Sequence, residues 1–218
     1  MSKHLALSAL LVALSLAAGA FLYPQMPDSV ASHWGAGGAV DGYMPKAWGV
    51  FMLPAITAVL LVLFAVIPVI DPLRDNIEAF RGYFDNFILL FASFMTAIYL
   101  QTLIWNLGYR INPMIVISAG LFALLYYTGI MLEHAKRNWS IGIRTPWTLS
   151  SDAVWVKTHK AGGRLFKVCG ILALAGVFAP QFALILILAP VLLTAAYATV
   201  YSYIEFGKER KKSGAKPT

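Results

Sequence analysis

The sequence is poor in charged residues and contains a single cysteine. Charged side chains make up 12% of its 218 residues, whereas hydrophobic ones make up 59% and the mean hydropathy is +0.71. About a quarter of the residues of a soluble domain are charged, so this composition excludes the soluble class and indicates an integral membrane protein. The lone cysteine, Cys169, excludes a disulfide within one chain and a zinc site built from cysteines.

The sequence also lacks the motifs of the common hydrolases and nucleotide-binding proteins. It contains no G-x-S-x-G elbow, no H-E-x-x-H pair and no phosphate-binding glycine loop. Asp152 and His159, with a nearby serine, have the residue types of a hydrolytic set, but on one short helix they would lie about two turns apart. No acidic residue lies at the centre of a predicted span, where ion-coupled transporters usually keep one. We therefore expect no catalytic residue, cofactor or metal, and no direct contact with nucleic acid.

Six apolar runs are long enough to cross a bilayer as helices, which need roughly 20 residues each. The expected fold is all-α, a polytopic plasma-membrane protein with six transmembrane helices. The predicted spans are residues 5–23, 47–70, 87–107, 113–132, 164–179 and 182–204. The fifth run is short, so Arg164 and Lys167 must extend toward the membrane interface.

The spans divide the chain into three parts, which differ in their polar connections. The parts are 1–70, a two-span module with the connecting loop 24–46; 71–132, a polar segment followed by the third and fourth spans; and 133–218, with the polar segment 136–163, the last two spans and a basic tail. In the polar segment that opens the second part, apolar residues recur at helical spacing among charges. This pattern predicts an amphipathic helix over 71–85 on the membrane surface.

The basic residues are distributed very unevenly over the connections. Of the 17 Lys and Arg residues, all but Lys46 and Arg110 lie at the N-terminus, in 71–85, in 136–167 or in the tail. Because Lys and Arg accumulate on the cytoplasmic side, both termini and the segment 136–163 are predicted to be cytoplasmic. Loop 24–46 then faces outward. An even number of spans is required by this arrangement, in agreement with six.

Loop 24–46 is rich in glycine and proline, which predicts a structured, turn-rich loop. Its candidate functional residues are Pro27, His33, Trp34 and Asp41. His33 and Asp41 are expected to meet across the glycine turn, as a metal pair, a proton-transfer pair or a hydrogen bond that stabilises the loop. Two ligands are too few for a zinc site, which favours the last of these roles.

Segment 136–163 contains three tryptophans at eight-residue spacing among basic side chains. This pattern is typical of a segment folded back onto the membrane–water boundary, with indole rings at headgroup level. Residues 138–146 are predicted to be turn-like, because Gly142 permits unusual backbone angles and Thr145 precedes Pro146. We expect Arg144 to bind a backbone carbonyl, a carboxylate or a lipid phosphate.

The second half of this segment is predicted to be a short helix over 151–160. Ser150 or Ser151 can cap its amides, and Gly162-Gly163 is expected to end it. Trp155 and His159 lie four residues apart and therefore share one face. The candidate residues of the whole segment are Asn138, Gly142, Arg144, Thr145, Pro146, Trp147, Trp155 and His159.

The run N-W-S-I-G-I-R-T-P-W-T-L, followed by W-V-K-T-H-K, resembles the signature of the SdpI family of membrane proteins. We therefore name residues 136–163 the signature segment. The earlier order M-P-D, H-W-G, D-G-Y and K, within 26–46, resembles a module of unknown function that often precedes this signature.

The resemblance implies immunity to, or sensing of, an extracellular killing peptide, with signalling through the signature segment. The implied partners are membrane lipids, a peptide toxin and a cytoplasmic repressor. Two other classes stay open on the residues alone: a membrane enzyme acting on lipid or peptide, and a structural or assembly protein without catalysis.

Overall fold

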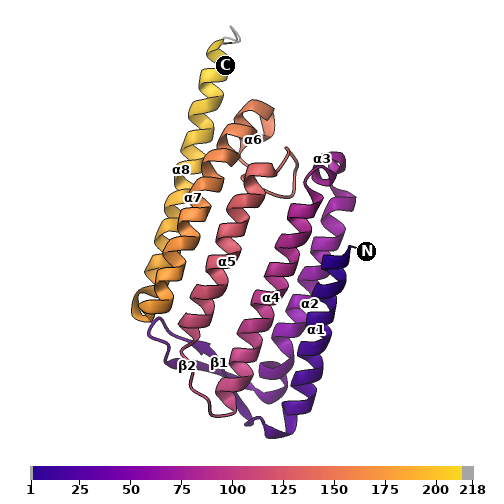
Figure 1. The fold of residues 1–218 in the computed structure, drawn as a ribbon, viewed down its shortest axis with the longest axis vertical. Helices are drawn as coiled ribbons and strands as arrows, with labels where there is room; N and C mark the ends of the chain where they lie inside the picture. The colour runs from indigo at the N-terminus through magenta and orange to yellow at the C-terminus, as the bar shows by residue number, and fades with distance from the viewer. Residues whose placement is uncertain (1, 213–218) are drawn as a thin grey trace.

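The computed structural model describes residues 2–212, and its main feature is a bundle of six long helices (Figure 1). All six are long and apolar enough to cross a membrane, which confirms the predicted number of spans. Their bounds are α1 Lys3–Leu22, α2 Lys46–Ile70, α4 Arg81–Asn106, α5 Pro113–His134, α7 Asp152–Phe178 and α8 Ala183–Lys212. Part of the predicted basic tail belongs to α8, and its last residues, 213–218, lie outside the described part of the chain.

The long helices pack as two groups of three. Helices α1, α2 and α4 contact one another, as do α5, α7 and α8, and the contact between α4 and α5 joins the groups (Figure 1). The largest buried apolar cluster lies at one end of the bundle and includes Ile77, Phe84, Met131 and Trp155. Helices of both groups therefore share a core at that end.

Glycines allow α5 and α7 to approach closely. A Cβ added to Gly163 would lie 2.6 Å from the carbonyl oxygen of Gly129, and one added to Gly129 would lie 2.4 Å from that of Gly163. The prediction that Gly162-Gly163 ends a short helix is therefore wrong. Helix α7 continues through both glycines, because here the missing side chains permit helix contact, as in small-residue membrane interfaces.

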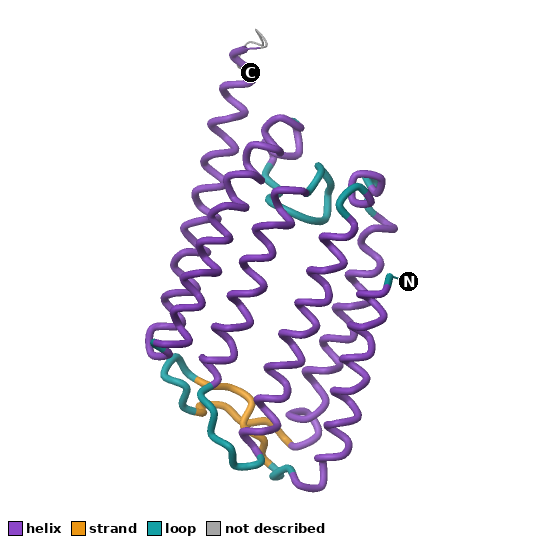
Figure 2. Tube along the Cα trace, in the orientation of Figure 1, coloured by secondary structure: helices purple, strands orange, loops and turns teal. Residues whose placement is uncertain are grey.

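Loop 24–46 forms a β-hairpin, so the all-α prediction missed one small element. Strands β1 (Ser29–Trp34) and β2 (Val40–Pro45) pair antiparallel, and they appear in orange in Figure 2. A turn with Gly38 at φ 79° joins them. The hairpin packs closely on α2, because a Cβ on Gly49 would lie 2.6 Å from the side chain of Val30. A 3₁₀ turn, Tyr23–Gln25, leads into it from α1.

The predicted amphipathic helix over 71–85 is also wrong in form. The structure has the short helix α3 (Arg74–Glu78) and then begins α4 at Arg81. The apolar residues that suggested the helix do share an environment, but Ile77 and Phe84 are buried in the protein core. They pack against other helices and do not lie on the membrane surface.

The signature segment and the hairpin lie at opposite ends of the bundle (Figures 1 and 2). The signature segment carries helix α6 (Pro146–Ser150) and the first part of α7. A second 3₁₀ turn, Pro180–Phe182, joins α7 to α8 at the end of the bundle that carries the hairpin (Figure 1). We call the two ends the signature end and the hairpin end.

Candidate functional site

Asn138 organises the first turn of the signature segment. Its side chain is fully buried, and its Oδ1 accepts hydrogen bonds from the backbone N–H groups of Ser140 (2.9 Å) and Ile141 (2.6 Å). Its Nδ2 donates to the carbonyl oxygens of Lys136 (2.8 Å) and Ile141 (3.0 Å). A carboxamide has two N–H donors and one oxygen that can accept two hydrogen bonds. Asn138 therefore uses its whole hydrogen-bonding capacity here.

Residues 135–145, between α5 and α6, are called the signature loop below. Trp155 and His159 form a stacked pair next to this loop. Their ring centroids are 3.9 Å apart at 17°, as their spacing on one helix face predicted. The indole Nε1 of Trp155 donates to the carbonyl of Ala135 at 2.8 Å. Trp155 is only 1% exposed, so its ring packs inside the protein and does not contact lipid headgroups. The indole serves as a core side chain with a satisfied polar atom.

Both ring nitrogens of His159 bind backbone groups. The N–H of Ile143 donates to Nε2 at 3.0 Å, so that nitrogen is an acceptor, and Nδ1–H donates to the carbonyl of Trp155 at 2.9 Å. This arrangement fixes one neutral tautomer. Gly142 crosses directly over the ring at φ 118°, and a Cβ there would lie 2.4 Å from Nε2. The predicted need for glycine at 142 is confirmed, and close approach adds a second reason for it.

The turn at Thr145 and Pro146 joins the loop to α8. Thr145 caps α6 in a reciprocal capping box with Thr148, and its hydroxyl contacts that of Ser202 on α8 at 3.0 Å. Trp147 packs edge-on against Tyr203 of the same helix, with centroids 5.1 Å apart. The predicted corner is therefore a docking point between the loop and the last span.

Arg144 and Trp139 form the exposed side of the loop. The guanidinium Nη1 of Arg144 donates to the carbonyl of Trp139 at 2.6 Å, one of the partners that we expected for this arginine. Trp139 is 54% exposed. These two side chains, unlike Trp155, remain accessible to lipid or to a partner.

Asp71, which follows directly on α2, fixes the signature loop to the N-terminal half of the protein. It is 3% exposed. Its Oδ2 accepts from the backbone N–H of Trp139 (3.0 Å) and the hydroxyl of Ser140 (2.6 Å), and its Oδ1 accepts from the N–H of Leu73 (2.8 Å). Sequence reasoning treated Asp71 only as one charge of a surface helix. The available signal was an acidic residue placed directly after an apolar span.

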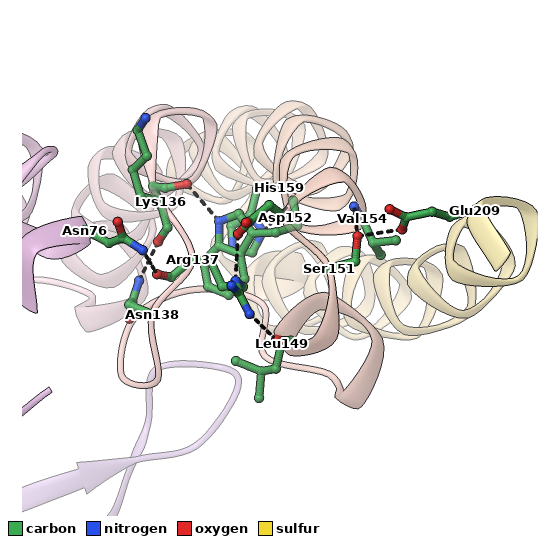
Figure 3. A network of polar contacts seen from close by, with 12 residues as sticks. Asn76, Lys136, Arg137, Asn138, Leu149, Ser151, Asp152, Val154, His159 and Glu209 are labelled. Atoms are coloured by element: carbon green, nitrogen blue, oxygen red, sulfur yellow. Dashed lines mark hydrogen bonds and ion pairs between the residues drawn. The ribbon is translucent and has the colours of Figure 1, made fainter. Parts of the chain in front are cut away.

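Polar contacts extend this attachment to both sides of the loop (Figure 3). Asn76 of α3 donates to the carbonyl of Arg137 at 2.7 Å. Arg137 in turn binds Asp152 (2.6 Å) and the carbonyl of Leu149 (2.8 Å). Because Asp152 binds Arg137, and because backbone groups occupy both nitrogens of His159, the structure does not assemble the hydrolytic set.

Helix α8 is fixed to the start of α7 by charged groups. Ser151, the N-cap of α7, donates to Glu209 at 2.5 Å. Glu205 is 5% exposed and accepts from Lys157 at 2.7 Å and Lys208 at 2.6 Å. The prediction of an N-cap near residue 151 is confirmed.

At the hairpin end, the predicted contact between His33 and Asp41 is present. Nδ1 of His33 and Oδ1 of Asp41 form an exposed ion pair or hydrogen bond across the strands. The described residues contain no cluster of three or more His, Cys, Asp or Glu side chains able to hold a metal. Pro27 is exposed before β1, and Trp34 packs edge-on against Trp105 at 5.7 Å.

Asn106 at the end of α4 holds the hairpin in place. Its Oδ1 accepts from the N–H of Ala31 (2.8 Å), and its Nδ2 donates to the carbonyl of the same residue (3.0 Å). The amide thus occupies the outer edge of β1 as a neighbouring strand would. The candidate residues predicted from the sequence do not include Asn106.

A cavity of about 300 Å³ lies beneath the hairpin, between β1, α2, α4 and α5. Its walls are mostly apolar and include three methionines. Among the lining residues are Trp34, Met44, Trp48, Met52, Tyr99 and Met114. Methionine side chains adapt to irregular apolar partners, so this cavity suits an apolar group of variable shape.

The predicted site residues therefore form two separate clusters. Residues of the signature segment gather at one end, and those of the hairpin gather at the other. Six helices able to cross a membrane, with a structured, polar segment at each end, define a multi-pass membrane protein whose candidate site residues lie at its two ends.

Two family models match the parts of the chain that contain these clusters. Residues 10–58 match a domain of unknown function, DUF1648, and residues 134–202 match the SdpI/YfhL protein family. The chain is 26% identical over 209 residues to "Immunity protein SdpI" of Bacillus subtilis (strain 168), which covers 95% of this chain and 98% of that protein. No solved structure gives a significant match. Together these matches support an SdpI-family protein with the DUF1648 domain ahead of the family region.

Proposed function

We propose that the chain gives immunity to an extracellular killing peptide by sensing it at the hairpin end and signalling at the signature end. The observation that carries this proposal is the likeness to an immunity protein along 95% of the chain. The matched DUF1648 domain contains the hairpin, and the matched SdpI/YfhL region contains the whole signature segment. The distribution of Lys and Arg supports an outward hairpin and a cytoplasmic signature segment.

The hairpin has one edge open to an extended peptide. Asn106 occupies both main-chain groups of Ala31, so Ala31 and its partner Tyr43 are a non-hydrogen-bonded pair. The main-chain groups of Tyr43 therefore point away from β1, and its side chain is 62% exposed. An extended peptide added along this edge would place side chains near the apolar cavity next to Met44.

Helix α2 supplies the connection between the two ends. It begins directly after β2, at Lys46, and its C-cap is Asp71, which binds the signature loop through Trp139 and Ser140. A displacement of the hairpin therefore reaches the loop through one helix. Pro54 and Pro68 interrupt the backbone hydrogen bonding of α2 and are places where it can bend.

The readout surface on the cytoplasmic side is the exposed part of the loop, around Trp139 and Arg144. An exposed indole beside an arginine is suited to a protein partner, because Trp and Arg are enriched at binding hot spots. We infer that a cytoplasmic repressor binds here when the peptide is present outside. His159 and Trp155 bind the buried side of this loop through the backbone of Ile143 and Ala135.

The test is survival of a sensitive host that expresses the chain and is challenged with the toxin against which the Bacillus subtilis protein gives immunity. His33→Ala is expected to lower survival and toxin binding at unchanged membrane abundance. Trp155→Ala is expected to keep toxin binding and to lose the cytoplasmic response. The proposal fails if both variants act only through abundance, or if the wild-type chain gives no protection and instead turns over lipid or peptide.

A further inference from the structure

Helices α7 and α8 enclose an open groove that no part of the immunity proposal uses. Its volume is about 460 Å³ and its walls are mainly aliphatic and aromatic. The lining residues are Ala161, Arg164, Leu165, Leu193, Thr194 and Tyr197. Because both helices belong to the membrane-crossing set, lipid is the medium that meets this groove.

Arg164 is the one lining residue with a formal charge, and it is exposed. Within residues 2–212 it has no hydrogen-bond or ion-pair partner. The acidic groups on the neighbouring helices have other partners: Glu205 pairs with Lys157 and Lys208, Glu133 pairs with Lys167, and Glu209 accepts a hydrogen bond from Ser151. The guanidinium therefore leaves a positive charge at the mouth of the groove that the described residues do not neutralise.

The depth of Arg164 makes this charge significant. From Arg164 to the end of α7 at Phe178 the helix rises roughly 21 Å, at 1.5 Å per residue. Because the hydrocarbon core of a bilayer is about 30 Å thick, a span of α7 that ends at Phe178 on the far side places Arg164 at or inside the near boundary. A charge at this depth is stabilised by drawing an anionic headgroup toward it.

We propose that this groove binds one anionic glycerophospholipid. Arg164 donates two hydrogen bonds to the phosphate, which its planar fork fits. One acyl chain lies along Leu165 and Leu193, and the ring of Tyr197, stacked on Tyr201 at 5.5 Å, forms the wall beside the headgroup. The bound lipid fills the space between α7 and α8, the two helices that follow the signature loop.

The experiment titrates the purified full-length protein in mixed micelles and counts bound lipid by native mass spectrometry. The probes are dioleoylphosphatidylglycerol and dioleoylphosphatidylcholine. We expect wild type to bind phosphatidylglycerol about fivefold more tightly than phosphatidylcholine, and Arg164→Gln to lose this preference. The matched control is Arg74→Gln, which removes the same charge from an exposed side chain on α3. This variant is expected to keep the preference for phosphatidylglycerol.

A second variant tests the acyl chain and does not depend on the charge. Leu193→Trp places a larger ring on the lipid-facing wall and is expected to weaken binding of both lipids; it decides the question if Arg164→Gln does not fold. Equal affinity for the two lipids, unchanged binding by Arg164→Gln, or unchanged binding by Leu193→Trp would overturn the proposal. Displacement of the lipid by millimolar inorganic phosphate would also overturn it, since the groove would then be a free-phosphate site.

Discussion

Removal of the Asp71 carboxylate is expected to release the signature loop while the helices stay folded. In Asp71→Ala, the N–H groups of Leu73 and Trp139 and the hydroxyl of Ser140 lose their acceptor. The six long helices keep their own backbone hydrogen bonds and apolar contacts. Asp71→Ala is therefore expected to weaken the attachment of the loop more than it lowers the stability of the helix bundle.

The size of the effect follows from the two lost bonds that reach the loop, those of Trp139 and Ser140. A hydrogen bond to a charged group contributes about 1.5–3 kcal/mol net, and such bonds around one side chain are not additive. We therefore expect Asp71→Ala to destabilise the loop attachment by about 3–5 kcal/mol. Asp71→Asn keeps one carbonyl oxygen and should lose about half of this. At about 1.4 kcal/mol per tenfold, a loss of 3 kcal/mol speeds local opening by roughly a hundredfold.

Hydrogen exchange in detergent or nanodiscs measures this opening at amides that do not bind Asp71. The amides of Ile141 and Ile143 are suitable, because they bind Asn138 and His159. The control is Asp75→Ala, which removes a fully exposed carboxylate four residues further on. Unchanged exchange at Ile141 and Ile143 in Asp71→Ala would show that the bonds of Asn76 and Asn138 hold the loop alone, and the reasoning would be refuted.

Two further substitutions test the packing that positions the two ends. Gly163→Ala is expected to force α5 and α7 apart and to lower the melting temperature by several degrees, whereas Gly82→Ala, with no atom within 4 Å of the added Cβ, should not. Asn106→Ala leaves both main-chain groups of Ala31 without a partner, so exchange of the Ala31 amide should rise at least tenfold. A protected Ala31 amide in that variant would contradict the assigned role.

Hydropathy and short spacings predicted the parts of the structure that depend on local sequence. The six spans follow from apolar length, and the stacking of Trp155 on His159 follows from their four-residue separation. The contact of His33 with Asp41 follows from the glycine turn between them. In each case the partners are close in sequence or the property is a sum over one segment.

The features that sequence reasoning missed depend on distant partners. Glycine is a residue type that commonly ends helices, which is why Gly163 suggested a helix end. Its close contact with Gly129 on another helix explains why it lies inside α7. Trp155 resembles an interface tryptophan, but in the fold it is buried in a cluster that includes residues of α4 and α5. Asp71 acquires its role from Trp139 and Ser140, 68 and 69 positions away. No local pattern reports such contacts.

The central claim is that the hairpin end meets the outside and the signature end meets the cytoplasm. Sided cysteine labelling tests it most directly, with single cysteines at Ala36 in the hairpin turn and at Ser150 at the end of α6, after Cys169→Ala. Both positions are exposed. An impermeant maleimide should label Ala36→Cys in intact cells and Ser150→Cys only after permeabilisation. Labelling of Ser150→Cys but not Ala36→Cys in intact cells would invert the protein and contradict the account.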